Sequence, residues 1–342
     1  MIEFVNERFI PVAVNNSRLQ RQADDEGRFL RLISWQGRYG YSFEEAQARL
    51  EDIDHGLNHQ GLYVVTTEGE VLGSRNRVFP GGKASVHGVG SDPDRFLWML
   101  RRALEKWENR KTQRAALDIE DLAYRDPTFS WTEYPEDGLI LHLGVRDLPR
   151  EVDTRPSGMK REAHNQDYVW FRREEVLSMV PPDAAVGDVI PMPDGLVRRL
   201  VRYHLADYVR GETSSWPSEA IQDAAMTLTV TEKTPEWVDL RLSGSAQLFS
   251  EGSWYEGACR ERGLDASLLG YLRFDRRVER FARFDVVAVG SRWGGTDYNV
   301  RQEDLEPAPI GIAMTIAGQE ARDRTAPHAC QRRGGLEWYF NA

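Results

Sequence analysis

The chain has 342 residues, of which 41% are hydrophobic and 10% aromatic, and it carries a formal net charge of −10. This length and hydrophobic content allow two domains with cores of their own and exclude an intrinsically disordered protein. The acidic balance argues against broad nucleic-acid binding, which requires a basic surface, and no apolar run approaches the roughly 20 residues that span a membrane.

The first part of the chain predicts a small mixed α/β domain. Residues 4–8 read as the end of a helix, and residues 9–15 read as a buried strand. Ser42 followed by Glu45 is a capping box, so we expect a helix to begin there. Residues 61–73 predict a strand, a tight turn and a second strand.

A long helix closes this part. Residues 75–90 are polar and rich in glycine, which indicates a surface loop. Ser91 or Asp92 then caps a helix with apolar residues at helical spacing from Phe96 to Trp107. The charged residues that follow suggest that the helix runs out into solvent, and we place a domain boundary near residue 115.

The second part, residues 116–342, predicts an α+β domain. Helices are expected at residues 172–179 and 195–210. Alternation of apolar and polar residues predicts several strands in succession, at residues 226–231, 238–244, 267–274, 280–290 and 310–316. Strands joined by short turns form an antiparallel meander, so we expect a largely antiparallel sheet or partial barrel packed by the second helix.

Residues 1–73 resemble the thioredoxin-like family. The resemblance rests on the pattern of residues 6–12, Asn-Glu-Arg-Phe-Ile-Pro-Val, and on the strand, turn and strand of residues 63–72. It implies a truncated, degenerate thioredoxin-like α/β domain over residues 1–115. The family's redox cysteines would lie upstream of Met1, and residues 60–62 lack the proline that the family places before the later strand. These departures argue against thiol–disulfide activity.

Residues 138–318 resemble the C-terminal part of uncharacterised bacterial proteins that carry such domains. The matching stretches are residues 164–170, 198–211 and 290–301. This resemblance implies no catalytic residue. The full fold-class prediction is therefore a thioredoxin-like α/β domain followed by an α+β domain with a largely antiparallel sheet or partial barrel.

Two pairs of residues suggest a divalent metal site. His164 and Asp167 are three residues apart, and His204 and Asp207 repeat this spacing. On a helix, that spacing directs both side chains to one side, as a mononuclear site requires. Alternatively, His204 is a core histidine on the apolar face of its helix, and Asp207 pairs with Arg202 or Arg210.

Arginines in the matching stretches suggest a site for a carboxylate or phosphate, which guanidinium groups bind in bidentate fashion. The candidate ligand-binding residues are Arg202, Arg210, Arg292, Trp293, Asn299 and Arg301. Alternatively, these arginines do not bind a ligand and only pair with some of the 54 acidic residues of the chain. Packing at a strand end is the alternative for Trp293.

Three weaker features complete the reading. His55 and His59 have a zinc-compatible spacing, although Gly56 favours a polar loop. Residues 87–92 precede a helix and could hold an anion. Cys259 and Cys330 are the only cysteines, and they lie in segments typical of a surface, where one disulfide or two unpaired thiols are both compatible with the sequence.

Two functional hypotheses follow. The first is a non-catalytic binding or accessory protein, in which the C-terminal domain binds a small molecule or a protein partner. The second is a metal-dependent or hydrolytic enzyme with its site in that domain and His164 and His204 among its first candidates. A redox motif encoded upstream of Met1 is a further alternative. No signal peptide opens the chain, but an exported precursor stays open, as does the compartment.

Overall fold

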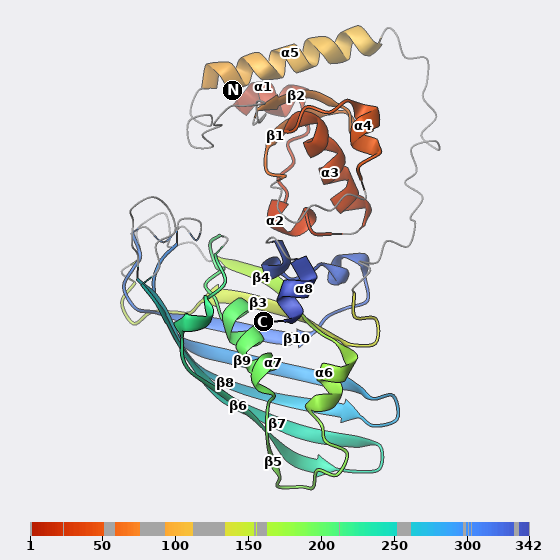
Figure 1. Ribbon diagram of the computed structural model, residues 1–342. Coiled ribbons are helices and arrows are strands. Elements are labelled where there is room, and N and C mark those ends of the chain that lie inside the picture. Colours follow the sequence, from red (N-terminus) through yellow and green to blue (C-terminus); the bar gives the residue numbers. More distant parts are fainter. Residues whose placement is uncertain are drawn as a thin grey trace. The chain divides into compact units, whose positions relative to one another are not determined.

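The computed structural model describes residues 2–22, 24–50, 59–75, 93–111, 134–153, 155, 163–211, 213–251, 261–296, 299, 301, 303–331 and 335–341. The chain divides into two compact units, Met1–Trp131 and Thr132–Ala342 (Figure 1). The boundary predicted near residue 115 lies outside the described residues. None of the described helices is long and apolar enough to cross a membrane.

The N-terminal unit is built from short helices and one hairpin. Its helices are α1 (Ile2–Arg8), α2 (Asn16–Leu19), α3 (Asp25–Gly37), α4 (Phe43–Gln47) and α5 (Pro93–Lys111), and its strands are β1 (Leu62–Val65) and β2 (Val71–Arg75). The predicted capping box is confirmed, since Ser42 accepts a hydrogen bond from the Glu45 amide and Glu45 accepts one from the Ser42 amide. The predicted hairpin is also confirmed, with β1 and β2 antiparallel and Gly69 in the turn at a positive φ of 84°.

One core cluster of this unit consists of Leu32, Trp35, Ala46 and Leu50, against which Tyr39, Tyr41 and Phe43 pack. Leu72, Met99, Leu100 and Ala103 are buried as well. His59, which was predicted to lie in a polar loop, is instead buried, and its Nδ1 lies 2.7 Å from the Ser34 hydroxyl. His55 and the predicted loops at residues 75–90 and 87–92 lie wholly or mainly outside the described residues.

The thioredoxin-like prediction for this unit is wrong. Within the described residues, its only sheet is the two-stranded pair β1–β2. The expected buried strand at residues 9–15 is not formed: this segment follows α1 without pairing in a sheet, and Ile10 is 90% exposed. The apolar run of this segment suggested a buried strand, but among the described residues no neighbouring strand supplies the backbone partners that a strand requires.

The C-terminal unit is a large antiparallel sheet of eight strands. Its strands are β3 (Leu139–Asp147), β4 (His164–Phe171), β5 (Val189–Pro191), β6 (Ile221–Lys233), β7 (Trp237–Ser250), β8 (Arg262–Asp275), β9 (Arg280–Gly294) and β10 (Ala308–Ile316). They are arranged in the order β4-β3-β10-β9-β8-β7-β6-β5. The protein is therefore mostly β, which overturns the fold class predicted from the sequence as a whole.

One face of this sheet carries the core. Strand β8 shows the reason, because Leu264, Leu268 and Leu272 alternate with exposed residues and point to the same side. Helices α6 (Arg173–Ser178) and α7 (Asp194–Tyr203) lie on that side (Figure 1). The buried face of α7, including Leu200 and Val201, packs into the same cluster as the inward residues of the strands.

The C-terminal segment covers the β4 edge of the sheet. It contains the 3-10 turns η5 (Ala321–Arg324) and η6 (His328–Gln331) and the helix α8 (Gly335–Phe340). The Tyr339 hydroxyl accepts a hydrogen bond from the Trp170 amide of β4 at 3.2 Å. An edge strand with free backbone groups is prone to unwanted pairing, so this contact protects the edge.

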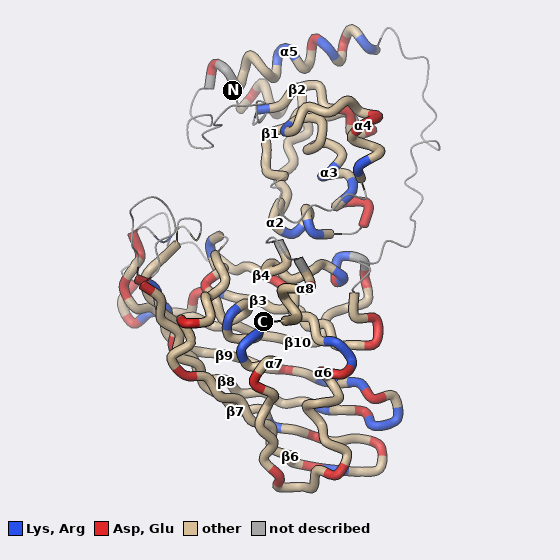
Figure 2. The backbone as a smooth tube through the Cα atoms, in the orientation of Figure 1, with Lys and Arg blue, Asp and Glu red and all other residues tan. Residues whose placement is uncertain are grey.

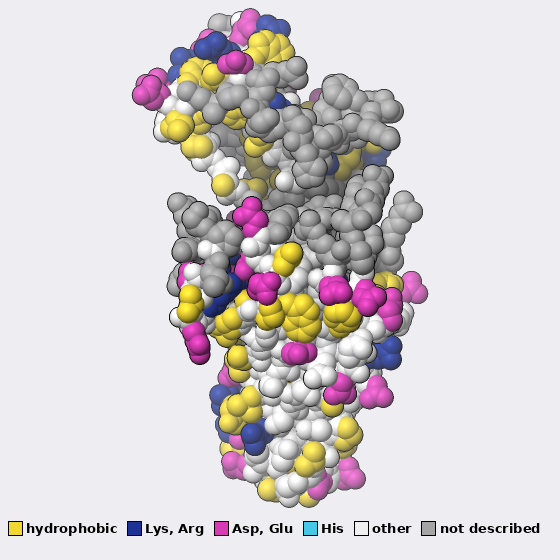
Figure 3. Space-filling model, turned by 90° about the vertical axis from the view of Figure 1, so that its left-hand side faces the viewer, with side chains coloured by type: hydrophobic (Ala, Val, Ile, Leu, Met, Phe, Trp, Pro, Cys, Tyr) yellow, Lys and Arg dark blue, Asp and Glu magenta, His cyan; other side chains and the backbone are white. Residues whose placement is uncertain are grey.

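Charged and hydrophobic residues are distributed unevenly over the surface of the C-terminal unit (Figure 2 and Figure 3). In the C-terminal unit, charged residues lie mainly towards strand ends and in connecting segments (Figure 2). On the side drawn in Figure 3, hydrophobic side chains form a row across this unit, with acidic side chains on both sides of the row.

Candidate functional site

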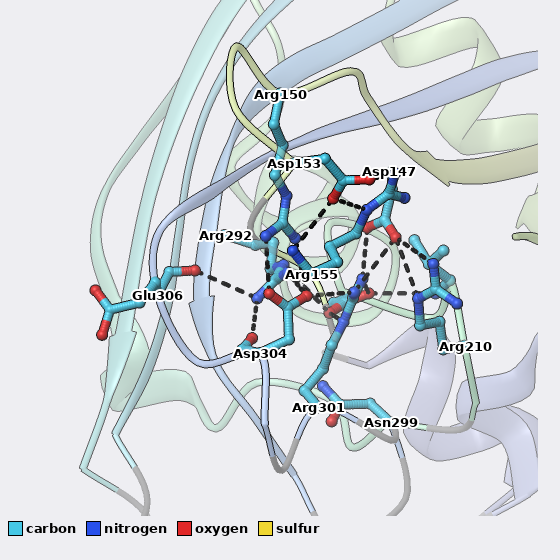
Figure 4. A network of polar contacts seen from close by, with 12 residues as sticks. Asp147, Arg150, Asp153, Arg155, Arg210, Arg292, Asn299, Arg301, Asp304 and Glu306 are labelled. Atoms are coloured by element: carbon cyan, nitrogen blue, oxygen red, sulfur yellow. Dashed lines mark hydrogen bonds and ion pairs between the residues drawn. The ribbon is translucent and has the colours of Figure 1, made fainter. Parts of the chain in front are cut away.

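The densest group of buried charges surrounds Arg301, which has no solvent-exposed surface. Four arginines and three aspartates form this network: Arg150, Arg210, Arg292, Arg301, Asp147, Asp207 and Asp304 (Figure 4). They come from the end of β3, the segment after α7, the end of β9 and the β9–β10 connection. Residues far apart in the sequence are thus joined at one end of the sheet.

Arg301 is the centre of the network. Its Nε and Nη2 donate to the two carboxylate oxygens of Asp207 at 2.8 and 3.1 Å. Nη2 also donates to Asp147 at 2.6 Å, and Nη1 donates to Asp304 at 3.0 Å. One planar guanidinium group therefore bridges three carboxylates, which an ammonium group could not do in this geometry.

The other arginines donate further hydrogen bonds to the aspartate carboxylates. Arg210 donates to Asp147 at 3.1 Å, and Arg150 donates to both oxygens of Asp304 at 2.9 and 2.8 Å. Arg292 also donates to Asp304. A ligand carboxylate would have to accept hydrogen bonds from these arginines, but the aspartates of the chain already accept them.

The electrostatics of the network keep it ionised. Burial alone would raise the pKa of Asp304, but the hydrogen bond from Arg150 and the charges of Arg292 and Arg301 lower it to about 2. The pKa of Asp147 is likewise lowered, because the hydrogen bond and charge of Arg301 outweigh its burial. Burial and the neighbouring charge of Arg301 lower the pKa of Arg292.

The predicted ligand-binding residues divide into two groups. Arg210, Arg292 and Arg301 come together in the network, and Asn299 lies beside Arg301 in Figure 4, where its Oδ1 accepts a hydrogen bond from the Thr296 amide at 3.0 Å. Two others lie elsewhere. Arg202 donates to the Trp216 carbonyl at 3.1 Å, and the Trp293 ring packs so closely on Gly263 that a Cβ there would lie 1.8 Å from it.

The predicted metal ligands do not assemble. The spacing argument assumed helices, but His164 and Asp167 lie on strand β4, where residues three apart point to opposite faces. Helix α7 ends at Tyr203, so His204 and Asp207 lie beyond it and point to different partners. Among the described residues, no three His, Cys, Asp or Glu side chains are grouped so that they could hold a metal ion.

Two of the predicted metal ligands, His204 and Asp167, taken from different pairs, do lie near each other in a buried group. His204 Nε2 lies 2.8 Å from the Tyr339 hydroxyl, and its Nδ1 lies 3.8 Å from Asp167. Burial, followed by the charge of Arg199, lowers the pKa of His204 to about 3, so the imidazole is neutral and the contact with Asp167 is not an ion pair. This is the core histidine that the sequence left as an alternative.

A pocket of about 430 Å³ lies beside this group, between α6, the start of α7 and α8. It is lined by Glu174, Glu175, Ser178, Pro193, Gly195, Leu196, Arg199, Phe340 and Asn341. A volume of this size is within the range of about 300–1,000 Å³ found for small-molecule sites. None of these residues was selected from the sequence as a site residue.

Arg199 is the most constrained residue of the pocket. Its two terminal nitrogens each donate to Glu175 at 2.7 Å, and its guanidinium carbon lies 5.1 Å from the centres of the Tyr339 and Phe340 rings. Burial is the largest influence and lowers its pKa, but the hydrogen bond to Glu175 and the charges of Tyr339, Glu175 and Cys330 together raise the pKa above its ordinary value. Arg199 Nε is buried and has no hydrogen-bond partner among the described residues.

The sequence held one signal for this pocket. Arg199 lies on the apolar side of α7, between Leu196 and Tyr203, where an arginine is unusual. Its partner Glu175 is on another helix, which no spacing rule connects to it. Cys330, expected near the surface, is buried close to this group, and Cys259 lies outside the described residues.

The chain was compared with known proteins in three ways. No family model, curated protein or solved structure matches it. These comparisons neither support nor refute the family resemblances noted in the sequence, and the functional argument depends on the geometry alone.

Proposed function

We propose that this is a non-catalytic binding protein whose C-terminal unit holds a small dipolar ligand in the pocket between α6, α7 and α8. The observation that carries the proposal is a pocket of ligand size whose lining holds both signs of charge, the guanidinium group of Arg199 and the carboxylate of Glu174.

The start of α7 supplies further donors. Pro193 occupies the N-cap position and provides no side-chain cap. Its carbonyl accepts from the Leu196 amide at 2.9 Å, which leaves the amides of Asp194 and Gly195 without an intrahelical acceptor. Gly195 lines the pocket, and a Cβ built there would meet no atom within 4 Å. The positive end of the helix dipole and the open glycine surface suit an anionic or carbonyl oxygen of the ligand.

A negatively charged group also lines the pocket. Glu174 is exposed at the pocket and has no ion-pair partner among the described residues, whereas Glu175 is already held by Arg199. Asn341 adds an amide, and Leu196 and Phe340 add apolar surface. A ligand with a carboxylate near α7 and an amine or hydroxyl near Glu174 would satisfy both sides, as an amino acid does.

The enzyme hypothesis is the second candidate, and the group of Asp167, His204 and Tyr339 is the observation in its favour. The order of carboxylate, imidazole and hydroxyl is that of a proton relay. However, the 3.8 Å gap between Asp167 and His204 is too long for a hydrogen bond, and burial raises the pKa of Tyr339. The geometry therefore favours a structural role, in which Tyr339 fastens α8 to α7 and β4.

The test is isothermal titration calorimetry of the tag-free full chain with a panel of amino acids, small carboxylates and small amines. We expect at least one amino acid to bind, and the Gly195→Trp variant, which fills the pocket, to abolish this binding. Arg198→Ala is the matched control, because Arg198 is exposed on the same helix and does not line the pocket. Absence of binding by the whole panel, or equal binding by Gly195→Trp, would overturn the proposal.

A further inference from the structure

The outer face of the large sheet departs from the pattern of a solvent-facing surface. When one face of an antiparallel sheet is buried, the residues between the buried ones are normally polar. On β8 and β9, however, four large hydrophobic residues occupy outward positions: Leu269, Tyr271, Val287 and Val289 are 38%, 49%, 46% and 51% exposed. Leu269 and Val287 are direct cross-strand partners.

The same sheet provides an internal comparison. The corresponding outward positions of β6 and β7 include Thr227, Thr229, Ser243 and Ser245, which are all polar. Of the exposed large hydrophobic side chains on the described strands of this sheet, four therefore lie on these two central strands, and the other, Val189, lies on the edge strand β5. Contiguous exposed hydrophobic groups of this kind mark contact surfaces.

Small residues extend the apolar strip to the side. Val287 is paired with Ala313 of β10, and Ala313 is paired with Gly144 of β3. Val289 is paired with Gly311. The strip is thus low at Ala313 and Gly144, whereas the Leu148 side chain lies over Gly311, 3.1 Å from the position that a Cβ would take.

We propose that this outer face binds a second copy of the chain, with β8 and β9 of the two copies facing each other across a two-fold axis. The axis lies in the plane of contact, perpendicular to the strands and along the row that contains Leu269 and Val287. This operation places like strands opposite each other and reverses their direction. Residues before the axial row in one copy then face residues after it in the other.

Charge complementarity argues for a second copy as the occupant. Arg241 of β7 is exposed on one side of the axial row, and Asp223 of β6 and Asp265 of β8 are exposed on the other side. Among the described residues, none of these three takes part in an ion pair. The two-fold operation brings Arg241 of one copy close to the strands on either side of β7 in the other, where Asp223 and Asp265 lie.

The face is also large enough. From β6 to β3 the outer face spans six strands, and five successive outward positions lie along β8 from Asp265 to Arg273. With strands ~4.8 Å apart and same-face residues ~6.8 Å apart, this face measures roughly 24 by 27 Å, or about 650 Å². A standard protein interface buries about 800 Å² per partner. A dimer of moderate affinity is the expected result.

The experiment is sedimentation velocity of the full chain over a wide concentration range. We expect a reversible dimer that Val287→Lys converts to monomer without lowering the melting temperature, because Val287 points away from the core. Val278→Lys is the matched control, since Val278 is 59% exposed in the β8–β9 turn, outside the proposed face. A wild-type chain that stays monomeric, or a Val287→Lys variant that dimerises normally, would overturn the proposal.

A charge-swap experiment tests the proposed orientation. Arg241→Asp and Asp265→Arg should each weaken the dimer about tenfold, the usual scale for a close charge pair. The double variant restores opposite charges across the two-fold axis and should recover most of the affinity. Additive weakening in the double variant would refute this arrangement of the two copies.

Discussion

Replacing Arg301 with methionine removes the one charge that bridges three buried aspartates. Asp147 would keep Arg210, and Asp304 would keep Arg150 and Arg292. Asp207 would keep only the Val209 amide at 3.2 Å and Arg292 Nε at 3.9 Å. Because removing one partner of a buried ion pair leaves an uncompensated charge, we expect the free energy of unfolding to fall by about 3–5 kcal/mol at neutral pH.

The pH dependence follows from the lowered pKa values of Asp147 and Asp304. A carboxylate with a lowered pKa in the folded state contributes stability above its unfolded pKa of about 3.9, and this contribution is lost as the pH falls through its folded value. In Arg301→Met the pKa of Asp147 rises, so the variant has less of this stability to lose. The difference between the two proteins should therefore shrink as the pH falls from about 4 towards about 2.

The assay is urea unfolding of both proteins at neutral pH and across this pH range. Arg280→Met is the control, because Arg280 and its partner Asp137 are 51% and 70% exposed. An exposed pair contributes about 0–1 kcal/mol, so this control should lie close to wild type. If Arg301→Met lies within 1 kcal/mol of wild type at neutral pH, or if the difference grows on acidification, the reasoning about the network is wrong.

Three further predictions concern buried contacts. His204 has a pKa of about 3 in the folded state against an ordinary value of 6.5, so its contribution to the free energy of unfolding is complete above pH 6.5 and declines on acidification. Below pH 6.5 the wild-type protein should lose up to about 1.4 kcal/mol per pH unit. The His204→Asn variant should lack this slope when urea unfolding is measured at different pH values. Tyr339→Phe removes the hydroxyl from His204 and from the Trp170 amide and should lower the unfolding free energy by about 1–3 kcal/mol in the same assay. Gly263→Ala would place a Cβ against the Trp293 ring, so we expect a loss of about 1–3 kcal/mol and a shift in tryptophan emission, and an unchanged protein would contradict the packing described.

Local pattern predicted several elements well. Alternation over residues 226–231 and 280–290 indicated strands, and the structure has β6 and β9 there. The capping box at Ser42 depended only on neighbouring residues and was confirmed. Such signals are short-range, so one sequence is enough to interpret them.

The errors came from contacts that a linear pattern does not contain. Residues 9–15 are largely apolar, as in a buried strand, yet none of the described strands pairs with them. The helix expected to continue to Arg210 ends at Tyr203, which frees Asp207 to meet Arg301 far along the chain. The sequence suggested the arginines as a ligand site because it could not show that Asp147, Asp207 and Asp304 already fill their hydrogen-bonding groups.

The central claim is that the pocket lined by Arg199 holds a small ligand, and native mass spectrometry of the freshly purified full chain tests it most directly. We expect a fraction of the wild-type protein to carry an adduct with the mass of a small polar molecule. The adduct should persist in Arg198→Ala and disappear in Gly195→Trp. An adduct-free protein that also binds none of the amino acids, carboxylates and amines of the calorimetric panel, or an adduct that Gly195→Trp retains, would contradict the account.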